Sequence, residues 1–286
     1  MRRRDALVLL ASAPLLACRK SGAVRVGSKN FSESVLLGEI LVQSLQRAGV
    51  AVEHKSNLGG SFVCHQAMLA GDLDAYVEYT GTALVAILKE PPQSDPDSVR
   101  RAVERAYADK FAMTWLPSLG FDDTFAILVR KADAARLSLS RVSDLAAHPE
   151  LRPGFGYEFV QRTDGYGAFA KAYGLSFASP PTTMELGLTY RALADGKVDV
   201  IAGNSTSGLV DKLDLVQLTD DRRFFPPYEA APVVRKELLD RRPEVLAAWS
   251  ALGGKLGTAA MRRLNQSLDV DGTPAATVAR TFLDTL

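Results

Sequence analysis

The 286-residue sequence has only two cysteines, Cys18 and Cys64, and only three histidines, His54, His65 and His148. If Cys18 ends an export signal, Cys64 has no partner, so a disulfide framework is excluded and we expect Cys64 to be a small buried residue. The histidines fit neither metal-ligand nor catalytic-triad spacing. A Gly-x-Ser-x-Gly motif and a phosphate-binding glycine loop are also missing. We therefore expect no metal, no cofactor and no enzyme activity.

The sequence also lacks an excess of charge and a second long apolar run. Its formal net charge is +1, without a basic cluster, which argues against nucleic acid as a partner. No stretch beyond residue 17 approaches the roughly 18 apolar residues of a membrane span. With 47% hydrophobic residues, the mature chain has enough apolar side chains for a large core of one or two domains.

The N-terminus has the pattern of an export signal. Three arginines at positions 2–4 precede an apolar run over 6–17, which is too short to span a bilayer and ends in Leu15-Leu16-Ala17-Cys18. This ending resembles a bacterial lipobox. We expect residues 1–17 to be a lipoprotein signal peptide and Cys18 to carry the lipid, at the periplasm or cell surface. The alternative to a lipoprotein signal is an ordinary secretory signal. The export route is left open between the Sec and the twin-arginine pathway, because the paired arginines permit either.

Short β-rich runs alternate with helical patterns along the mature chain, which is typical of α/β architecture. A helix ending near residue 109 is expected to be capped by Asp97 or Ser98. The tail over 243–286 has a helical pattern broken at glycines. The other predicted strands and helices, in chain order, cover residues 24–28, 32–48, 50–54, 63–70, 73–76, 123–131, 154–157, 166–173, 186–194 and 198–203.

Two segments about 125 residues apart echo each other, at 67–75 and 191–200. Each has a helix end, a glycine (Gly71 or Gly196) that tolerates left-handed backbone, and a strand entered through an aspartate. The echo favours two similarly built lobes, although such turns are common in α/β proteins.

Polar side chains follow three predicted strands, at residues 28–33, 78–82 and 204–208. In open α/β sheets, ligands bind beyond the carboxyl ends of strands, where helix N-termini present free N–H groups. Ordinary helix capping by serine, threonine or asparagine is the alternative at each place. The segment Phe224-Phe225-Pro226-Pro227-Tyr228 predicts either a stiff exposed aromatic platform or a cover over a core edge.

These segments together carry a family resemblance. Residues 26–33 (VGSKNFSE), 57–61 (NLGGS), 71–82 (GDLDAYVEYTGT), 224–235 (FFPPYEAAPVVR) and 252–256 (LGGKL) resemble the substrate-binding proteins of osmoprotectant ABC importers, which take up glycine betaine, choline, carnitine and related quaternary amines. The resemblance implies a two-lobe periplasmic-binding-protein clamshell, type II-like, with a mixed sheet flanked by helices in each lobe. It places lobe one at 24–123 plus 225–286 and lobe two at 124–224.

The resemblance also implies ligand-binding residues. Lys29 and Thr82 match residues that hold a ligand carboxylate, and Arg162 matches the lobe-two partner that closes on it, a task suited to a planar guanidinium. Tyr79 and Tyr228 match two rings of the cage for the quaternary ammonium, a cation without N–H donors that ring faces attract.

Two cage positions depart from the family pattern. Phe125 replaces a tyrosine, which keeps the ring and loses the hydroxyl. Asn204 stands where another aromatic is common, and Ser207 replaces an aspartate nearby. Losing one ring removes roughly 1–2 kcal/mol of cation–π attraction, or about 5–30-fold in affinity.

The expected partners are a small quaternary-amine or zwitterionic ligand, an ABC permease and a membrane contacted through the lipid anchor, with the protein acting as a monomer. The alternatives are a binding protein or sensor for a different small zwitterion, such as an amino acid derivative, and an enzyme on the same fold.

Overall fold

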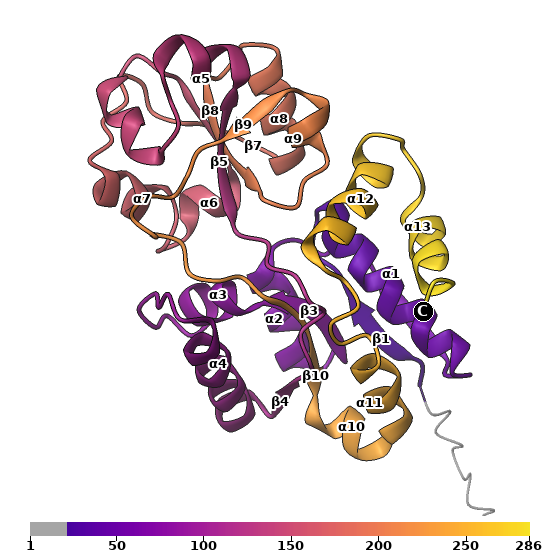
Figure 1. The fold of residues 1–286 in the computed structure, drawn as a ribbon. Coiled ribbons are helices and arrows are strands. Elements are labelled where there is room, and N and C mark those ends of the chain that lie inside the picture. Colours follow the sequence, from indigo (N-terminus) through magenta and orange to yellow (C-terminus); the bar gives the residue numbers. More distant parts are fainter. Residues whose placement is uncertain (1–21) are drawn as a thin grey trace, which may run out of the picture.

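The computed structural model describes residues 22–286, which form two five-stranded sheets, each flanked by helices (Figure 1). The predicted signal peptide and Cys18 lie outside the described residues. None of the helices in residues 22–286 is long and apolar enough to cross a membrane. Cys64 is free and buried, as expected.

The first sheet, with its helices, is called lobe one below. Strand β1 runs parallel to β2 and β3, whereas β10 is antiparallel to β3 and β4. In spatial order the strands are β2 (Val52–Lys55), β1 (Val24–Gly27), β3 (Ala75–Tyr79), β10 (Ala230–Arg235) and β4 (Met113–Trp115). The helices are α1 (Ser32–Arg47), α2 (Ser61–Ala70), α3 (Thr80–Thr82), the π-helical turn η1 (Ala83–Ile87), α4 (Pro96–Phe111), α10 (Lys236–Arg241), α11 (Pro243–Ser250), α12 (Thr258–Asp269) and α13 (Ala275–Leu283).

The second sheet, with its helices, is called lobe two. Strand β6 is parallel to β7 and β8, and β5 is antiparallel to β8 and β9. In spatial order the strands are β7 (Thr182–Met184), β6 (Pro153–Gly156), β8 (Val200–Asn204), β5 (Phe125–Arg130) and β9 (Leu215–Gln217). The helices are α5 (Lys131–Leu137), the 3₁₀ helix η2 (Val142–Ala147), α6 (Tyr157–Gln161), α7 (Tyr166–Tyr173), α8 (Leu186–Ala194) and α9 (Leu209–Lys212).

The chain passes between the two sheets twice, from β4 to β5 and from β9 to β10. Lobe two therefore comes from one continuous stretch inserted between two parts of lobe one (Figure 1). The residue boundaries, near 123–125 and 220–225, stay a proposal. The predicted fold class of two helix-flanked mixed sheets is confirmed.

The sequence echo corresponds to one local structure made twice. Asp74 Oδ2 accepts hydrogen bonds from Arg25 N at 2.8 Å and Nε at 3.0 Å, while Asp74 N donates to Arg25 O at 2.8 Å. In lobe two, Asp199 Oδ2 accepts from Arg152 N at 3.0 Å and Nε at 2.7 Å, and Asp199 N donates to Arg152 O at 2.7 Å. Each aspartate thus fixes the start of one strand, β3 or β8, against its parallel neighbour, β1 or β6.

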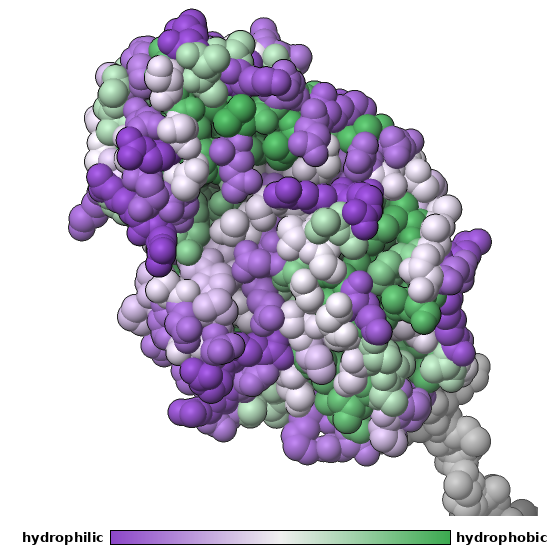
Figure 2. Space-filling model, viewed as in Figure 1, coloured by the Kyte–Doolittle hydropathy of each residue, from purple (hydrophilic) through white to green (hydrophobic). Residues whose placement is uncertain are grey.

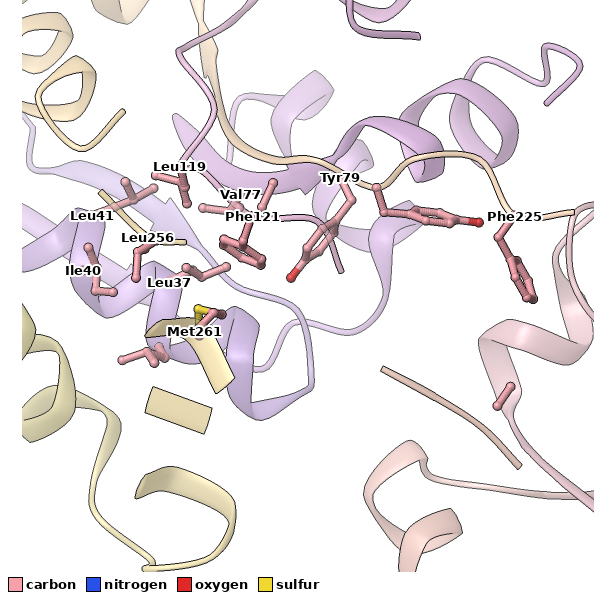
Figure 3. Close-up of a cluster of buried hydrophobic side chains, with 14 of the residues drawn as sticks. Leu37, Ile40, Leu41, Val77, Tyr79, Leu119, Phe121, Phe225, Leu256 and Met261 are labelled. Atoms are coloured by element: carbon pink, nitrogen blue, oxygen red, sulfur yellow. The ribbon is translucent and has the colours of Figure 1, made fainter. Parts of the chain in front are cut away.

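The lobe-one core forms where α1 packs between the sheet and the C-terminal helices. Figure 3 shows Leu37, Ile40 and Leu41 of α1 close to Leu256 and Met261. Each fully buried aliphatic side chain of this kind contributes about 1.5–3 kcal/mol. The C-terminal segment is therefore an integral part of lobe one.

One local expectation is corrected, and one pair of alternatives is decided. Helix α4 begins at Pro96, and its cap is Asp95, whose carboxylate accepts a hydrogen bond from Ser98 N at 2.8 Å. Proline fits the first helical position because its missing N–H would have no partner there. The aromatic segment is not an exposed platform, since Phe225 and Tyr228 are buried; Phe225 stacks on Phe169 and covers the edge of the core.

Candidate functional site

All seven predicted ligand-binding residues line one cavity between the two sheets. The cavity has a volume of about 360 Å³, at the small end of the range for ligand pockets. The seven residues are Lys29, Tyr79, Thr82, Phe125, Arg162, Asn204 and Tyr228. The structure therefore brings together residues that are up to 199 positions apart in the sequence, counting from Lys29 to Tyr228.

The strand topology explains why these residues meet. Tyr79 is the last residue of β3 and Asn204 is the last of β8, so both lie at the carboxyl ends of central strands. Phe125 begins β5, which is antiparallel to β8, and pairs directly with Asn204. The site thus occupies the edge where ligands bind in open α/β sheets.

Lys29 is held in place by a buried acidic partner. Its Nζ lies 2.5 Å from Glu78 Oε1, and both side chains are almost fully buried. Glu78 also accepts hydrogen bonds from Tyr76 Oη at 3.1 Å and Tyr79 N at 2.8 Å. Lys29 Nζ lies 4.6 Å from the centre of the Tyr79 ring. Glu78 therefore compensates the lysine charge in a region where an unpaired charge is costly.

Arg162 has both an acidic partner and a partner in the opposite lobe. Its Nε and Nη2 donate to the two carboxylate oxygens of Asp164, at 2.7 and 2.5 Å. Its Nη1 donates to Thr82 Oγ1 at 3.0 Å, which joins lobe two to lobe one. Burial alone would lower the pKa of Arg162, but the hydrogen bond and charge of Asp164, with the nearby Tyr228, raise it. The guanidinium is therefore a permanent cation in the cavity wall.

Aromatic rings form the adjoining wall. The rings of Phe125 and Tyr228 are nearly perpendicular, with centroids 5.6 Å apart. Arg162 Cζ lies 5.3 Å from the centre of the Phe125 ring and 5.8 Å from that of Tyr228. Gly81 allows this arrangement, because a Cβ there would lie 2.8 Å from atoms of the Tyr228 ring. These rings provide the electron-rich faces that attract a cation.

Two buried carboxylates, missed by the sequence analysis, meet behind the cavity. Thr206 Oγ1 lies 2.5 Å from Glu33 Oε2 and 2.8 Å from Asp123 Oδ1. Glu33 also accepts from Tyr79 Oη at 2.6 Å and Asn265 Nδ2 at 2.7 Å. Because one hydroxyl has one proton, Thr206 donates to one carboxylate and must accept from the other. A proton on either carboxyl group would complete the second of these hydrogen bonds.

Burial raises the pKa of both carboxyl groups. For Glu33, hydrogen bonds from Thr206 and Tyr79 offset part of the effect of burial. For Asp123, the charge of Glu33 adds to the effect of burial. Asp123 also accepts from Asn204 Nδ2 at 2.9 Å, so the asparagine side chain is held by this carboxylate.

The missed residues had partial signals in the sequence. Glu33 and Glu78 lie inside the segments that carry the resemblance, and Asp164 is two residues after Arg162. Their pairing depends on which side chains become buried together, which spacing alone does not show.

The chain is similar to known proteins along almost its whole length. Residues 22–285 match the model of the substrate-binding domain of ABC-type glycine betaine transport systems, and the chain belongs to this family. It is 37% identical over 276 residues to a carnitine transport binding protein of Listeria monocytogenes, covering 95% of this chain and 89% of that protein. It is 33% identical to a glycine-betaine-binding protein of Pseudomonas aeruginosa, covering 99% and 94%.

A solved structure described as a glycine betaine/carnitine/choline ABC transporter superposes with a TM-score of 0.76 at 37% identity, covering 92% of this chain and 98% of that one. The predicted family and the two-lobe binding-protein fold are therefore confirmed. The chain is a substrate-binding protein of the ABC-transporter class, whose members are transport proteins and not enzymes.

Proposed function

We propose that this protein captures a quaternary-amine solute of the glycine betaine, choline or carnitine type between its lobes and delivers it to an ABC permease. The observation that carries the proposal is the convergence of seven separately predicted residues on one interlobe cavity. Relatives at 33–37% identity are named for binding carnitine, glycine betaine and ergothioneine.

Each wall of the cavity has a proposed role. Tyr79, Phe125 and Tyr228 surround the ammonium group, whose charge is attracted to ring faces. Arg162 and Lys29 bind a carboxylate on the ligand. Asp164 and Glu78 each use only part of the donor capacity of these cations, because a guanidinium has five N–H donors and an ammonium has three.

A thermal-shift panel tests the proposal with glycine betaine, choline, carnitine and ordinary amino acids. A ligand at 100 times its dissociation constant adds about 2.7 kcal/mol to stability, which such a scan detects. We expect quaternary amines to raise Tm and amino acids with a primary ammonium to leave it unchanged. The opposite ranking would contradict the proposal. Mass spectrometry after incubation should recover each ligand intact, because we assign no catalytic role to the cavity.

We further propose that residues 1–17 are removed and that lipidated Cys18 anchors a monomeric protein at the periplasmic or outer face of a membrane. The motif Leu15-Leu16-Ala17-Cys18 supports this proposal. A Cys18→Ser variant should appear in the soluble extracytoplasmic fraction. If that variant fractionates with membranes as the unaltered protein does, the anchor lies elsewhere.

A further inference from the structure

Two carboxylates meet at one hydroxyl group behind the ligand cavity. Thr206 Oγ1 lies 2.5 Å from Glu33 Oε2 and 2.8 Å from Asp123 Oδ1, and all three side chains are buried. The single hydrogen of the hydroxyl group can serve only one of these two acceptors. The other contact becomes a hydrogen bond only when a carboxyl group supplies a proton.

Each of the two carboxylates is fixed to a different lobe. Glu33 is on α1, and it accepts hydrogen bonds from Tyr79 Oη at 2.6 Å and Asn265 Nδ2 at 2.7 Å, both in lobe one. Asp123 lies in the segment that passes from β4 to β5, and its carboxylate is bound to residues 204–206 of lobe two at 2.8 to 3.4 Å. When the lobes separate, Glu33 therefore stays with lobe one and Asp123 with lobe two.

Closure brings these two acidic groups together without a cation to compensate them. Within residues 22–286, neither Glu33 nor Asp123 forms a salt bridge. The charged or titratable side chains that face the pair from the elements packed around it are Tyr79 of β3, Asp122 before β5, Glu185, Tyr190 and Arg191 at α8, and Arg262 and Asp269 of α12. Arg262 donates to Ser205 O, at 2.9 Å. Two adjacent carboxyl groups in such a place do not both ionise readily.

The closed arrangement favours a protonated carboxyl group, and separation of the lobes removes that preference. Burial raises the pKa of both groups, and for Asp123 the charge of Glu33 adds to the effect of burial. When the lobes separate, water reaches both groups and the two charges move apart, so both causes weaken. The two forms of the protein therefore differ in their affinity for a proton.

Given the capture function proposed above, we infer that closure of the lobes around the solute takes up one proton at the Glu33–Asp123 pair. The proton comes from water, adds to one of the two carboxylates and completes the second hydrogen bond at Thr206. Opening of the lobes returns it to water. The two carboxyl groups titrate as a unit. Because linkage is reciprocal, the protein binds its solute more tightly in an acidic than in an alkaline medium.

Calorimetry in buffers with different enthalpies of ionisation counts the protons that the purified protein takes up on binding. The probes are glycine betaine, choline and carnitine, whose charges change little between about pH 5 and 8. We expect the observed enthalpy to depend on the buffer, with an uptake of up to one proton. The dissociation constant should rise with pH by up to about tenfold per pH unit.

Two variants and a matched control locate the proton. Glu33→Gln and Asp123→Asn each remove one acidic group, so the remaining carboxylate no longer faces a like charge and the uptake should fall to less than about half. The control is Asp269→Asn, because burial also raises the pKa of Asp269, which lies near the pair on α12. This control should keep the uptake of the unaltered protein. If Asp269→Asn removes the uptake and the two pair variants keep it, the inference is wrong.

The outcomes separate this inference from the proposed function. If a probe binds with a constant affinity and without proton uptake, the inference is wrong and the proposed function stands, whether or not the variants fold. If no probe binds, the proposed function is wrong, and X-ray scattering of the ligand-free protein tests the inference by itself. The radius of gyration should then be larger at about pH 8 than at about pH 5, because deprotonation favours separated lobes. An unchanged radius would contradict the inference.

Discussion

The hydroxyl of Thr206 lies 2.5 Å from the carboxylate of Glu33 and connects lobe two to lobe one behind the ligand cavity. Two further hydrogen bonds join the same regions, from Asn265 Nδ2 to Thr206 O at 3.0 Å and from Arg262 Nε to Ser205 O at 2.9 Å. Figure 2 shows hydrophilic side chains along the junction of lobe two with the C-terminal helices. We propose that these contacts stabilise the closed form, so hinge closure on binding involves α12 as well as the ligand.

Thr206→Val should therefore weaken ligand binding, although it changes none of the aromatic rings that line the cavity. A hydrogen bond to a charged group is worth about 1.5–3 kcal/mol, so affinity should fall roughly 10–100-fold. The control is Thr281→Val at an exposed position of helix α13, where the hydroxyl donates to Thr277 O. Equal calorimetric affinities for the two variants would show that the contact does not stabilise the bound form.

Gly208→Ala should hold the lobes apart. A Cβ at Gly208 would lie 2.5 Å from Gln266 Cα, which is backbone of α12 and cannot rotate away. We expect weaker ligand binding and, at saturating ligand, a larger radius of gyration by X-ray scattering than the unaltered protein shows. In the control Gly167→Ala, the new Cβ meets nothing within 4 Å. If the ligand-bound Gly208→Ala protein is as compact as the unaltered protein, closure does not require the close approach of Gly208 to α12.

Tyr79→Ala and Tyr228→Ala should each weaken a quaternary-amine ligand more than about tenfold, because each removes a desolvated ring face. Tyr228→Phe is the matched control, since it keeps the ring and removes only the hydroxyl that donates to Asp164 at 3.1 Å. Calorimetry distinguishes the two. If the phenylalanine variant loses as much affinity as the alanine variant, the hydroxyl and not the ring is responsible.

Arg162→Ala should reduce stability and carboxylate binding together. The variant leaves Asp164 as an unpaired buried charge, at a cost of about 3–5 kcal/mol in the free energy of unfolding. The double variant Arg162→Ala, Asp164→Ala should recover much of that stability in a denaturant titration. It should still bind glycine betaine weakly while losing less affinity for choline, which has no carboxylate. If affinity for glycine betaine and for choline falls equally, Arg162 does not bind the ligand carboxylate.

Stability should fall as the pH rises through the raised pKa values of the coupled carboxyl groups. Burial raises the pKa of Glu33, and burial with the charge of Glu33 raises that of Asp123. A raised folded-state pKa contributes stability that is fully present below the unfolded value, about 4.5 for Glu33, and is lost at higher pH. Glu33→Gln removes one titrating group of the pair. Its free energy of unfolding, measured from about pH 5 to 8, should therefore change less with pH than that of the unaltered protein; parallel curves would contradict the account.

Strand ends were the most predictable part of the site. The positions of Tyr79 and Asn204 follow from local pattern, since each ends a strand that begins after an aspartate in a repeated turn. The pairing of Glu33 with Asp123 was not predictable in this way, because it depends on a helix of lobe one, a crossing segment and a loop of lobe two meeting in three dimensions. Burial of Phe225 was left open because an aromatic–proline segment has the same composition whether it covers a core or faces solvent.

The most direct test of the account compares cationic ligands with neutral carbon isosteres. Glycine betaine and 3,3-dimethylbutanoate have the same shape, as do choline and 3,3-dimethylbutan-1-ol, but only the first of each pair carries the ammonium charge. If Tyr79, Phe125 and Tyr228 hold a quaternary ammonium, calorimetry should show each cation binding at least about tenfold more tightly than its isostere. Equal affinities within both pairs would contradict the claim that the cavity recognises the ammonium group.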